Sequence, residues 1–353
     1  MRAGLRSRPW AGIDVGSFSV KLLAAHPGVG GQRYVAAEVP FVAADADPER
    51  PPSAETVAKA ISECLSRAGF SARSFRGVSL GIGGPDVIVK QITLPLLDDS
   101  EVGPALRFEA RKHLPFDPQG MILDFQILGR LATERKLDIL LAAVSQEHAE
   151  RHMAPLRLLD IEPDILDAAP LALSNALVQG GDAQSPAHVL LDIGNSASHL
   201  TLSQRGEPFF SRRLDFGGRT LTRAVAQSTQ VPFDEAEEWK LAAGADQPGL
   251  RVDWESPELR AISECLRHDL VDELRRSFAF YRTQGHLPDP LKLWLSGGSA
   301  RLPGLAARLS EMLAAPVALF DPIHHHSGAG ARGGASAGGP QFAQAFGLAT
   351  RTK

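Results

Sequence analysis

The sequence predicts an α/β protein built from two equivalent lobes, and three glycine-bearing turns are the main reason. Two apolar runs, one in each half of the chain, end in the turns Asp14-Val15-Gly16-Ser17 and Asp192-Ile193-Gly194-Asn195. A third apolar run ends in Ser296-Gly297-Gly298-Ser299. One such segment would indicate little, because Asp and Gly favour ordinary turns. Since all three follow a strand pattern, we expect a duplicated fold whose lobes meet at these turns.

Strand and helix patterns alternate along the rest of the chain, as expected of α/β lobes. The segment from Ser53 to Ala68 has apolar residues at helical spacing, with Ser53 suited to its N-cap and Gly69 to its end. Pro115 is expected to stop a helix over 101–113, because proline disfavours helical geometry in the preceding residue. The other expected helices are 148–159, 166–178 and 266–281. The expected strands are a strand-turn-strand unit over 13–23, then 78–82, 87–94 at a sheet edge, 123–128 and 139–144.

Composition and charge are those of a soluble, intracellular globular protein. The length of 353 residues favours two lobes over one core, and the net charge of −4 gives no argument for nucleic acid or an anionic membrane surface. Cys64 and Cys265 lie far apart in the sequence and indicate no oxidising compartment. The basic start lacks the apolar stretch of a secretory signal, and no run approaches the ~20 apolar residues that span a bilayer.

The three turns carry groups that would hold a nucleotide and its metal ion. Glycine lets the backbone approach a phosphate closely, and successive turn N–H groups form an anion-binding concavity. Asp14 and Asp192 could hold the waters around Mg²⁺, while Ser17 and Lys21 could contact phosphate oxygens. The residues expected to bind the nucleotide are Asp14, Gly16, Ser17, Lys21, Asp192, Gly194, Asn195, Ser296, Gly297, Gly298 and Ser299.

Further segments match a more specific pattern, and they run over nearly the whole chain. They are Arg107 to Phe116, Leu123 to Leu128, Asp215 to Leu221, Phe233 to Lys240, Leu295 to Leu305 and Phe342 to Arg351. Together with the three turns, they resemble the PilM family of actin-like proteins, which act in type IV pilus assembly. That family is part of a superfamily with actin, hexokinase and the division protein FtsA.

The resemblance implies an actin-like (ribonuclease H-like) duplicated two-lobe fold with small inserted subdomains. The implied boundaries are 10–185 for the first lobe, with an inserted subdomain at about 95–150, and 186–322 for the second, with a subdomain at about 225–265. Residues 323–353 would then be a Gly/Ser-rich loop and a C-terminal helix that returns to the first lobe. We expect the loop, 327–340, to be mobile.

The resemblance also implies a function. PilM proteins bind ATP, with Mg²⁺, and grip a short cytoplasmic N-terminal peptide of PilN, a bitopic inner-membrane protein. This chain is therefore expected to be a cytoplasmic scaffold, peripheral to the inner membrane through a PilN-like partner, without membrane insertion of its own and without nucleic acid. A ring or another homo-oligomer is left open. The candidates for the peptide groove are Phe108, Leu114 and Phe116, although core positions in a small subdomain are an alternative for each.

One segment departs from the superfamily pattern. The helix before the second turn often carries an acidic or amide residue that orients the attacking water, and here Ala169 takes that place. Asp167 lies two residues earlier, where helical geometry would aim it elsewhere. Without an oriented water, hydrolysis loses positioning and general-base help, so the expected enzyme is at most a slow ATPase.

Two alternatives to the ATP-binding scaffold stay open. One is a nucleotide-free pseudo-actin scaffold of a related secretion or competence system. The other, less expected, is a small-molecule kinase of the same superfamily, for which no sugar-binding signature is visible. The run His324-His325-His326 could suggest a metal site, but three adjacent side chains cannot converge on one ion, so none is expected.

Overall fold

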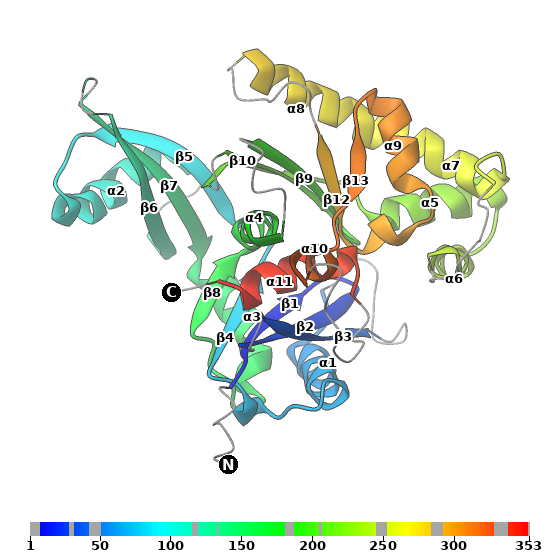
Figure 1. Ribbon diagram of the computed structural model, residues 1–353, viewed down its shortest axis with the longest axis horizontal. Helices are drawn as coiled ribbons and strands as arrows, with labels where there is room; N and C mark the ends of the chain where they lie inside the picture. Colours follow the sequence, from blue (N-terminus) through cyan, green and yellow to red (C-terminus); the bar gives the residue numbers. More distant parts are fainter. Residues whose placement is uncertain are drawn as a thin grey trace.

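Two five-stranded sheets with the same strand order form the two lobes of the protein (Figure 1). The computed structural model describes residues 8–27, 32–41, 51–114, 119–131, 133, 135–180, 187–204, 207–244, 253–283, 292–327 and 338–351. The first sheet has the order β3-β2-β1-β4-β8, with β1 (Trp10–Val15), β2 (Ser19–His26), β3 (Arg33–Pro40), β4 (Gly77–Ile82) and β8 (Ile165–Ala168). The second has the order β11-β10-β9-β12-β13, with β9 (Ala187–Ile193), β10 (Ser198–Gln204), β11 (Glu207–Leu214), β12 (Leu293–Ser296) and β13 (Val317–Leu319).

The two sheets also share their pairing pattern, which confirms the duplicated α/β fold. Strand β1 pairs antiparallel with β2 and parallel with β4, and β9 pairs antiparallel with β10 and parallel with β12. The Asp-x-Gly turns close the two equivalent hairpins, β1-β2 and β9-β10. Asp14 and Asp192 therefore occupy corresponding positions near the ends of the two central strands.

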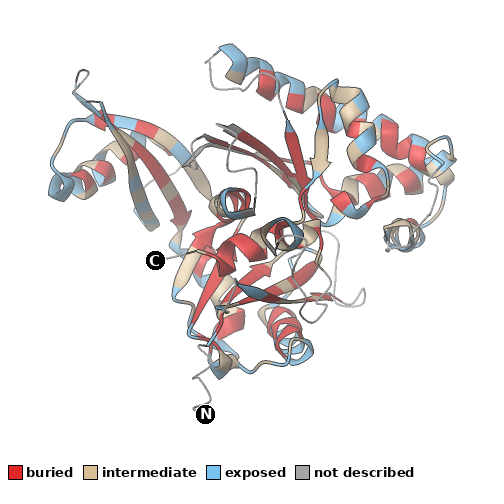
Figure 2. Cartoon of the chain, in the orientation of Figure 1, coloured by how far each residue is buried: buried red, intermediate tan, exposed pale blue. Residues whose placement is uncertain are grey.

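Two helices lie between the sheets and join the lobes (Figure 1). They are α4 (Ala169–Gly180) and α11 (Ala343–Ala349), and they cross so closely that a Cβ on Gly347 would lie 1.7 Å from the carbonyl oxygen of Ala172. Only glycine permits this approach. A buried cluster around this crossing contains Leu23 from the first sheet and Leu190 from the second. This buried layer is the red centre of Figure 2, and it connects the two sheets.

Other helices cover the outer faces of the sheets. In the first lobe, α1 (Ala54–Arg67) buries Ile61 and Cys64 against the sheet, and the backbone N–H of Thr56 donates to the expected N-cap, Ser53. Gly69 ends this helix region with a φ of +74°. The same lobe also contains α3 (Gln146–Arg157). Helices of the second lobe are α5 (Gly218–Thr229), α6 (Phe233–Ala243), α7 (Pro257–Cys265), α8 (Asp272–Thr283) and α9 (Leu305–Leu313). The short α10 (Pro322–Ser327) lies instead beside α4 and α11 at the centre of the molecule (Figure 1).

A small subdomain is inserted between β4 and α3. Its sheet has the order β5-β7-β6, formed by β5 (Ile88–Pro95), β6 (Met121–Leu131) and β7 (Lys136–Ser145), and one helix, α2 (Asp99–His113), covers it. Val102 and Leu106 on α2 pack with Ile139 and Leu141 on β7 in a core of their own. The expectation of an edge strand near 87–94 is confirmed, because β5 is an outer strand of this sheet.

Two helix predictions need correction. The helix expected over 166–178 begins only at Ala169, because 165–168 form β8, which pairs in parallel with β4 through Leu80 and Leu166. The local pattern is compatible with either structure, and the neighbouring buried strand decides for β. The helix expected over 266–281 is longer. It runs through α7, a π-helical segment (Leu266–Val271) and α8.

Among the residues that the structure describes, no helix combines the length and the apolar character needed to cross a membrane. Most of the glycine-rich segment 327–340 lies outside the described residues.

Candidate functional site

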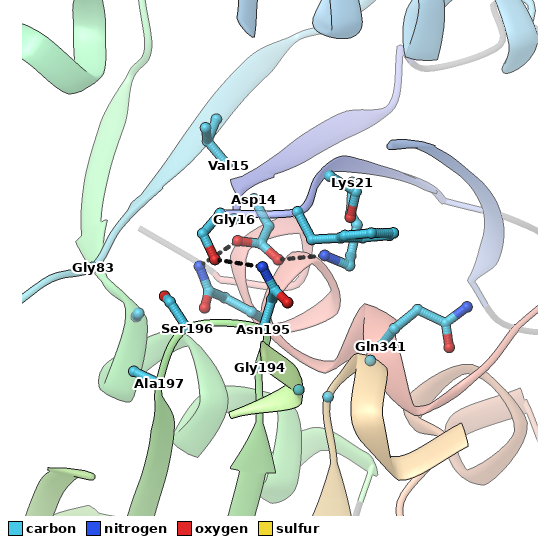
Figure 3. A pocket seen from close by; sticks show the side chains of 18 of the residues that line it. Asp14, Val15, Gly16, Lys21, Gly83, Gly194, Asn195, Ser196, Ala197 and Gln341 are labelled. Atoms are coloured by element: carbon cyan, nitrogen blue, oxygen red, sulfur yellow. Dashed lines mark hydrogen bonds and ion pairs between the residues drawn. The ribbon is translucent and has the colours of Figure 1, made fainter. Parts of the chain in front are cut away.

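A cavity of about 640 Å³ lies between the lobes, and the three glycine-bearing turns form its walls (Figure 3). The residues predicted to bind a nucleotide line this cavity, with one exception: Ser296 is fully buried behind Asp192. The structure therefore brings together, in one place, residues that are up to almost 300 positions apart in the sequence. Each turn contributes through a different local geometry.

The first turn places a carboxylate beside a cation. The backbone N–H of Gly16 donates to the carbonyl of Ser19 at 3.0 Å, which closes the β1-β2 hairpin. The Asp14 carboxylate accepts a hydrogen bond from the Gln344 amide at 2.8 Å and lies 3.7 Å from the Lys21 ammonium. Burial raises the pKa of Asp14, and Lys21 opposes that rise. Lys21 also lies 3.9 Å from Glu38, so it is held between two carboxylates.

The second turn is closed in the same way, but the residue across the hairpin from its aspartate is a histidine and not a lysine. Its Gly194 N–H donates to the carbonyl of Ala197 at 3.1 Å. The Asp192 carboxylate accepts a hydrogen bond from the Ser296 hydroxyl at 2.7 Å. Burial raises the pKa of Asp192 to about 6, and the charge of the facing Asp14 adds to the rise. The two aspartates thus make an acidic pair on opposite walls of the cavity.

A side-chain hydrogen bond connects the first two turns across the cavity. The Asn195 amide donates to the Ser17 hydroxyl at 3.4 Å, as the dashed line in Figure 3 shows. These two polar groups therefore face the same space from opposite lobes, where a phosphate could replace their contact with one another.

The third turn depends on glycine. Gly297 has a φ of +90°, and a Cβ there would lie 2.4 Å from the carbonyl oxygen of Ile193. A Cβ on Gly298 would meet nothing within 4 Å, so this residue presents open backbone to the cavity. The Ser299 hydroxyl donates to the Gly194 carbonyl at 3.3 Å and ties the third turn to the second.

Sequence reasoning gave no role to a buried polar group at the second-lobe end of the cavity. The Lys240 ammonium donates to the Glu237 carboxylate at 2.7 Å, to the Thr222 hydroxyl at 2.7 Å and to the Gly218 carbonyl at 3.0 Å. Burial lowers the pKa of Lys240, and Glu237 opposes that change. Both side chains line the cavity. The sequence pattern picks out the segment Phe233 to Lys240, but only the packing of α6 against α5 shows which of its residues reach the cavity.

Sequence reasoning also missed His199. It lies on β10 directly across from Asp192 on β9 and Arg213 on β11, and it lines the cavity. The available signal was the hairpin itself. In a tight hairpin around the second turn, a residue seven positions after Asp192 returns to its side.

The two residues discussed for water positioning lie apart. Ala169 begins α4 and lines the cavity, as expected. Asp167 is on β8, is buried, and forms an ion pair with Arg351, so it does not line the cavity. The strand, not a helix, decides where this carboxylate points.

The three peptide-groove candidates have different surroundings. Phe108 is 72% exposed on α2. Leu114 is 7% exposed and belongs to the core of the inserted subdomain, which is the alternative considered for it. Phe116 lies outside the described residues.

The three consecutive histidines have separate neighbours. His325 packs edge-on against Trp294, with ring centroids 5.2 Å apart. His326 contacts the carbonyl of Gln179 at 3.0 Å, and His324 pairs with Asp321. Across the described ranges, no group of three or more His, Cys, Asp or Glu side chains is arranged to hold a metal ion directly.

Comparisons with known proteins agree with this architecture. The family described as type IV pilus assembly protein PilM matches residues 12–353. A solved PilM-PilN type IV pilus biogenesis complex is similar at 26% identity, with a TM-score of 0.78 and 98% of each chain covered. The ethanolamine utilization protein EutJ from Carboxydothermus hydrogenoformans shares the fold at 15% identity, with a TM-score of 0.51 over 97% of this chain and 88% of that one. The expected actin-like two-lobe fold is confirmed.

Proposed function

The chain belongs to the family of the type IV pilus assembly protein PilM, and we propose that it is a nucleotide-binding scaffold of a pilus machine. In this proposal it docks the cytoplasmic N-terminal peptide of a PilN-like inner-membrane protein. That partner holds it at the cytoplasmic face of the inner membrane. The likeness to the PilM-PilN complex over 98% of the chain supports a partner of this kind.

The nucleotide part of the proposal is carried by one observation, the two carboxylates that face each other across the cavity. Asp192 accepts a hydrogen bond from a hydroxyl and has a raised pKa, as expected of a carboxylate whose natural partner is a cation. Mg²⁺ suits this place, because it prefers a few carboxylates and retains its waters. Asp14 and Asp192 would hold those waters and leave room for the phosphates of ATP.

The remaining cavity residues fit the other parts of ATP. Turn N–H groups, Ser17 and Lys21 would contact the phosphates, with Asn195 and Ser299 facing them from the second lobe. The open backbone at Gly298 would accommodate a flat base. Glu237 and Lys240, an acceptor and a donor, would hydrogen-bond the sugar hydroxyls.

The peptide part of the proposal places the partner on the inserted subdomain. Phe108 is a large apolar side chain left exposed on α2, and it belongs to the segment that resembles the family most specifically. Apolar pockets and main-chain hydrogen bonds are the usual means of holding an extended peptide. Leu114 would support this region from the core.

Calorimetric titration tests nucleotide binding. The nucleotide-stripped protein should bind ATP with Mg²⁺, and Asp14→Ala should lose that binding. Asp124→Ala, which removes an exposed carboxylate on β6, is the matched control and should bind as the native chain does. A folded native chain that takes up no ATP would instead favour a nucleotide-free scaffold.

Peptide docking has its own test. A synthetic peptide with the N-terminal cytoplasmic sequence of a PilN-like protein from the same organism should bind, and Phe108→Ala should weaken it about tenfold or more. Phe280→Ala is the control, because Phe280 is also an exposed aromatic residue but lies on α8 in the second lobe. Equal losses in the two variants would contradict the placement on the inserted subdomain.

A further inference from the structure

We infer that the first-lobe end of the cavity is a second ligand site, and that it takes a small carboxylic acid with a hydroxyl group. The site lies between one face of α3, the start of α1 and the Gly83-Gly84 turn that follows β4. The proposed nucleotide site uses none of these residues. The inference therefore goes beyond the proposed function, and it does not depend on ATP binding.

The internal duplication of the fold gives each lobe a Gly-Gly turn at the cavity. Strand β4 runs parallel to β1, as β12 runs parallel to β9, and a Gly-Gly pair follows both β4 and β12. Gly84 has a φ of +122° and Gly297 a φ of +90°, so each turn requires a glycine. Both turns line the cavity. The second-lobe turn presents its backbone to the proposed nucleoside, whereas its first-lobe counterpart has no assigned ligand.

One face of α3 forms the wall beside the first-lobe turn. His148, Arg151 and His152 are three or four residues apart along the helix, so they point to the same side, and all three line the cavity. His148 is 8% exposed. Its Nε2 atom contacts the carbonyl of Gly83 at 2.8 Å, and its Nδ1 atom lies 3.6 Å from the Asp86 carboxylate. His148 thus holds the turn against α3, which leaves Arg151 and His152 to contact a ligand.

His152 offers a hydrogen-bond acceptor. Its Nδ1 atom lies 3.2 Å from the carbonyl of His148, and because a carbonyl can only accept, Nδ1 carries the proton. Burial lowers the pKa of His152 to about 4, and interaction with His148 adds to the change, so the ring is neutral at pH 7. The Nε2 atom therefore keeps its lone pair, and it has no hydrogen-bond partner among the described residues. A ligand hydroxyl is a suitable donor to it.

Arg151 offers a cation one position before His152. Its side chain is 61% exposed, and within the described ranges its one ion-pair partner is Glu147, whose carboxylate lies 3.9 Å from the Arg151 Nε atom. Exposed pairs of this kind are weak, so the guanidinium can turn to a ligand carboxylate, which it can bind through two parallel hydrogen bonds. A carboxylate suits this place better than a phosphate dianion, because one guanidinium balances one negative charge.

The rest of the wall is apolar. Pro51, Pro52 and Val57 line it from the segment before α1 and from α1 itself, and Pro155 lines it from α3. Their side chains can contact a carbon skeleton but form no hydrogen bonds. Ligand pockets typically combine a mostly apolar lining with a few placed polar groups. An acceptor, a cation and apolar walls together match a short acid that carries a hydroxyl group.

Ligand-observed NMR and calorimetric titration of the nucleotide-free protein with glycerate test the inference. Glycerate has a carboxylate and hydroxyl groups, whereas glycerol lacks the carboxylate and propionate lacks the hydroxyls. Glycerate should bind at millimolar concentration, and the other two compounds about tenfold more weakly or less. Arg151→Ala should weaken glycerate binding about tenfold or more, and the exposure of Arg151 makes unfolding of this variant unexpected. Arg157→Ala is the matched control, because Arg157 is exposed on the same helix, pairs with Glu150 and does not line the cavity.

His152→Ala should also weaken glycerate binding about tenfold, with thermal melting to establish that the variant is folded. Equal binding of glycerate and propionate, an equal loss in Arg157→Ala, or no glycerate binding by the folded native chain would overturn the inference. A loss in Lys21→Ala without a loss in Arg151→Ala would also overturn it, because the acid would then lie at the phosphate turns. None of these results bears on ATP binding, so failure of this inference and failure of the proposed function are measured separately.

Discussion

The first and second turns have the same backbone hydrogen bond but carry different charges around their aspartates. Both are hairpin turns closed by the same main-chain hydrogen bond, and each holds an aspartate whose pKa is raised by burial. Asp14 has the Lys21 ammonium across the hairpin, whereas Asp192 has His199, whose pKa is lowered to about 4 by burial and by the charge of Arg213. The duplication thus preserves the geometry that brings groups to the cavity, while the residue across each hairpin sets its charge. The first hairpin therefore places an ammonium group beside the cavity, and the second places an imidazole there.

The largest effect is expected from removing the Lys21 ammonium. Lys21→Ala should weaken ATP binding by about 10- to 100-fold, because a charge-assisted contact contributes ~1.5–3 kcal/mol. AMP should be affected little, since Lys21 is placed at the outer phosphates. His199→Ala, at the equivalent position, should leave both affinities nearly unchanged. Calorimetric titration of both variants with both nucleotides checks this, and equal losses for ATP and AMP would contradict the placement of Lys21.

The next largest effect is expected in how stability and ATP affinity depend on pH. The pKa of Asp192 is about 6 in the folded chain against an ordinary value of 3.8, so ionisation costs stability as pH rises from about 4 through 6. In Mg²⁺-free buffer, the Tm of the native chain relative to Asp192→Asn should fall across that window. Binding of ATP with Mg²⁺ needs the carboxylate, so its affinity should rise over the same range.

The control for this experiment is the Asp192→Asn variant itself, which lacks the titrating group. A Tm difference between the two proteins that stays constant from pH 4.5 to 7.5 would show that the Asp192 carboxyl is not the group that titrates.

The turn glycines should respond unequally to alanine. A Cβ on Gly194 would lie 2.7 Å from the carbonyl oxygen of Ala197, whereas one on Gly16 would lie 3.3 Å from that of Ser19. Because the backbone must shift in the first case, Gly194→Ala should cost about 1–3 kcal/mol of unfolding free energy, and Gly16→Ala less. Chemical denaturation of both variants measures the difference. The reverse order would mean that the second turn is the more adaptable.

The contact between the lobes should matter least in the nucleotide-free protein. The hydrogen bond from Asn195 to Ser17 is long, at 3.4 Å, and exposed. Asn195→Ala and Ser17→Ala should each change the unfolding free energy by no more than about 0.5 kcal/mol. A double-mutant cycle gives their coupling, and a coupling above about 1 kcal/mol would show that this bond holds the cavity closed.

Much of the fold could be predicted because the patterns that indicate it involve residues close together in the sequence. An apolar run before an Asp-x-Gly turn, a serine N-cap such as Ser53 and a positive-φ glycine such as Gly69 involve neighbouring residues only. These patterns predicted the three turns, the helix α1 and the inserted subdomain's edge strand. They also placed the future cavity residues at the ends of strands, where an α/β fold gathers its polar groups.

Other features depended on segments far apart in the chain. Residues 165–168 form a strand because β4 lies beside them, and Leu114 is buried because β7 packs against its helix. Lys240 and His199 line the cavity only through the way α6 and β10 are placed.

The sequence by itself determined that the chain has two lobes and which turns meet between them. The reason is that the repeated turn motifs, and the geometry of each turn, depend on a few consecutive residues. Tertiary structure alone decided the chemical state of the groups in those turns. The partner of Asp14 is Gln344, 330 positions away, and that of Asp192 is Ser296, 104 positions away. Burial and neighbouring charge set a pKa and a hydrogen bond, and both arise only when distant segments pack together.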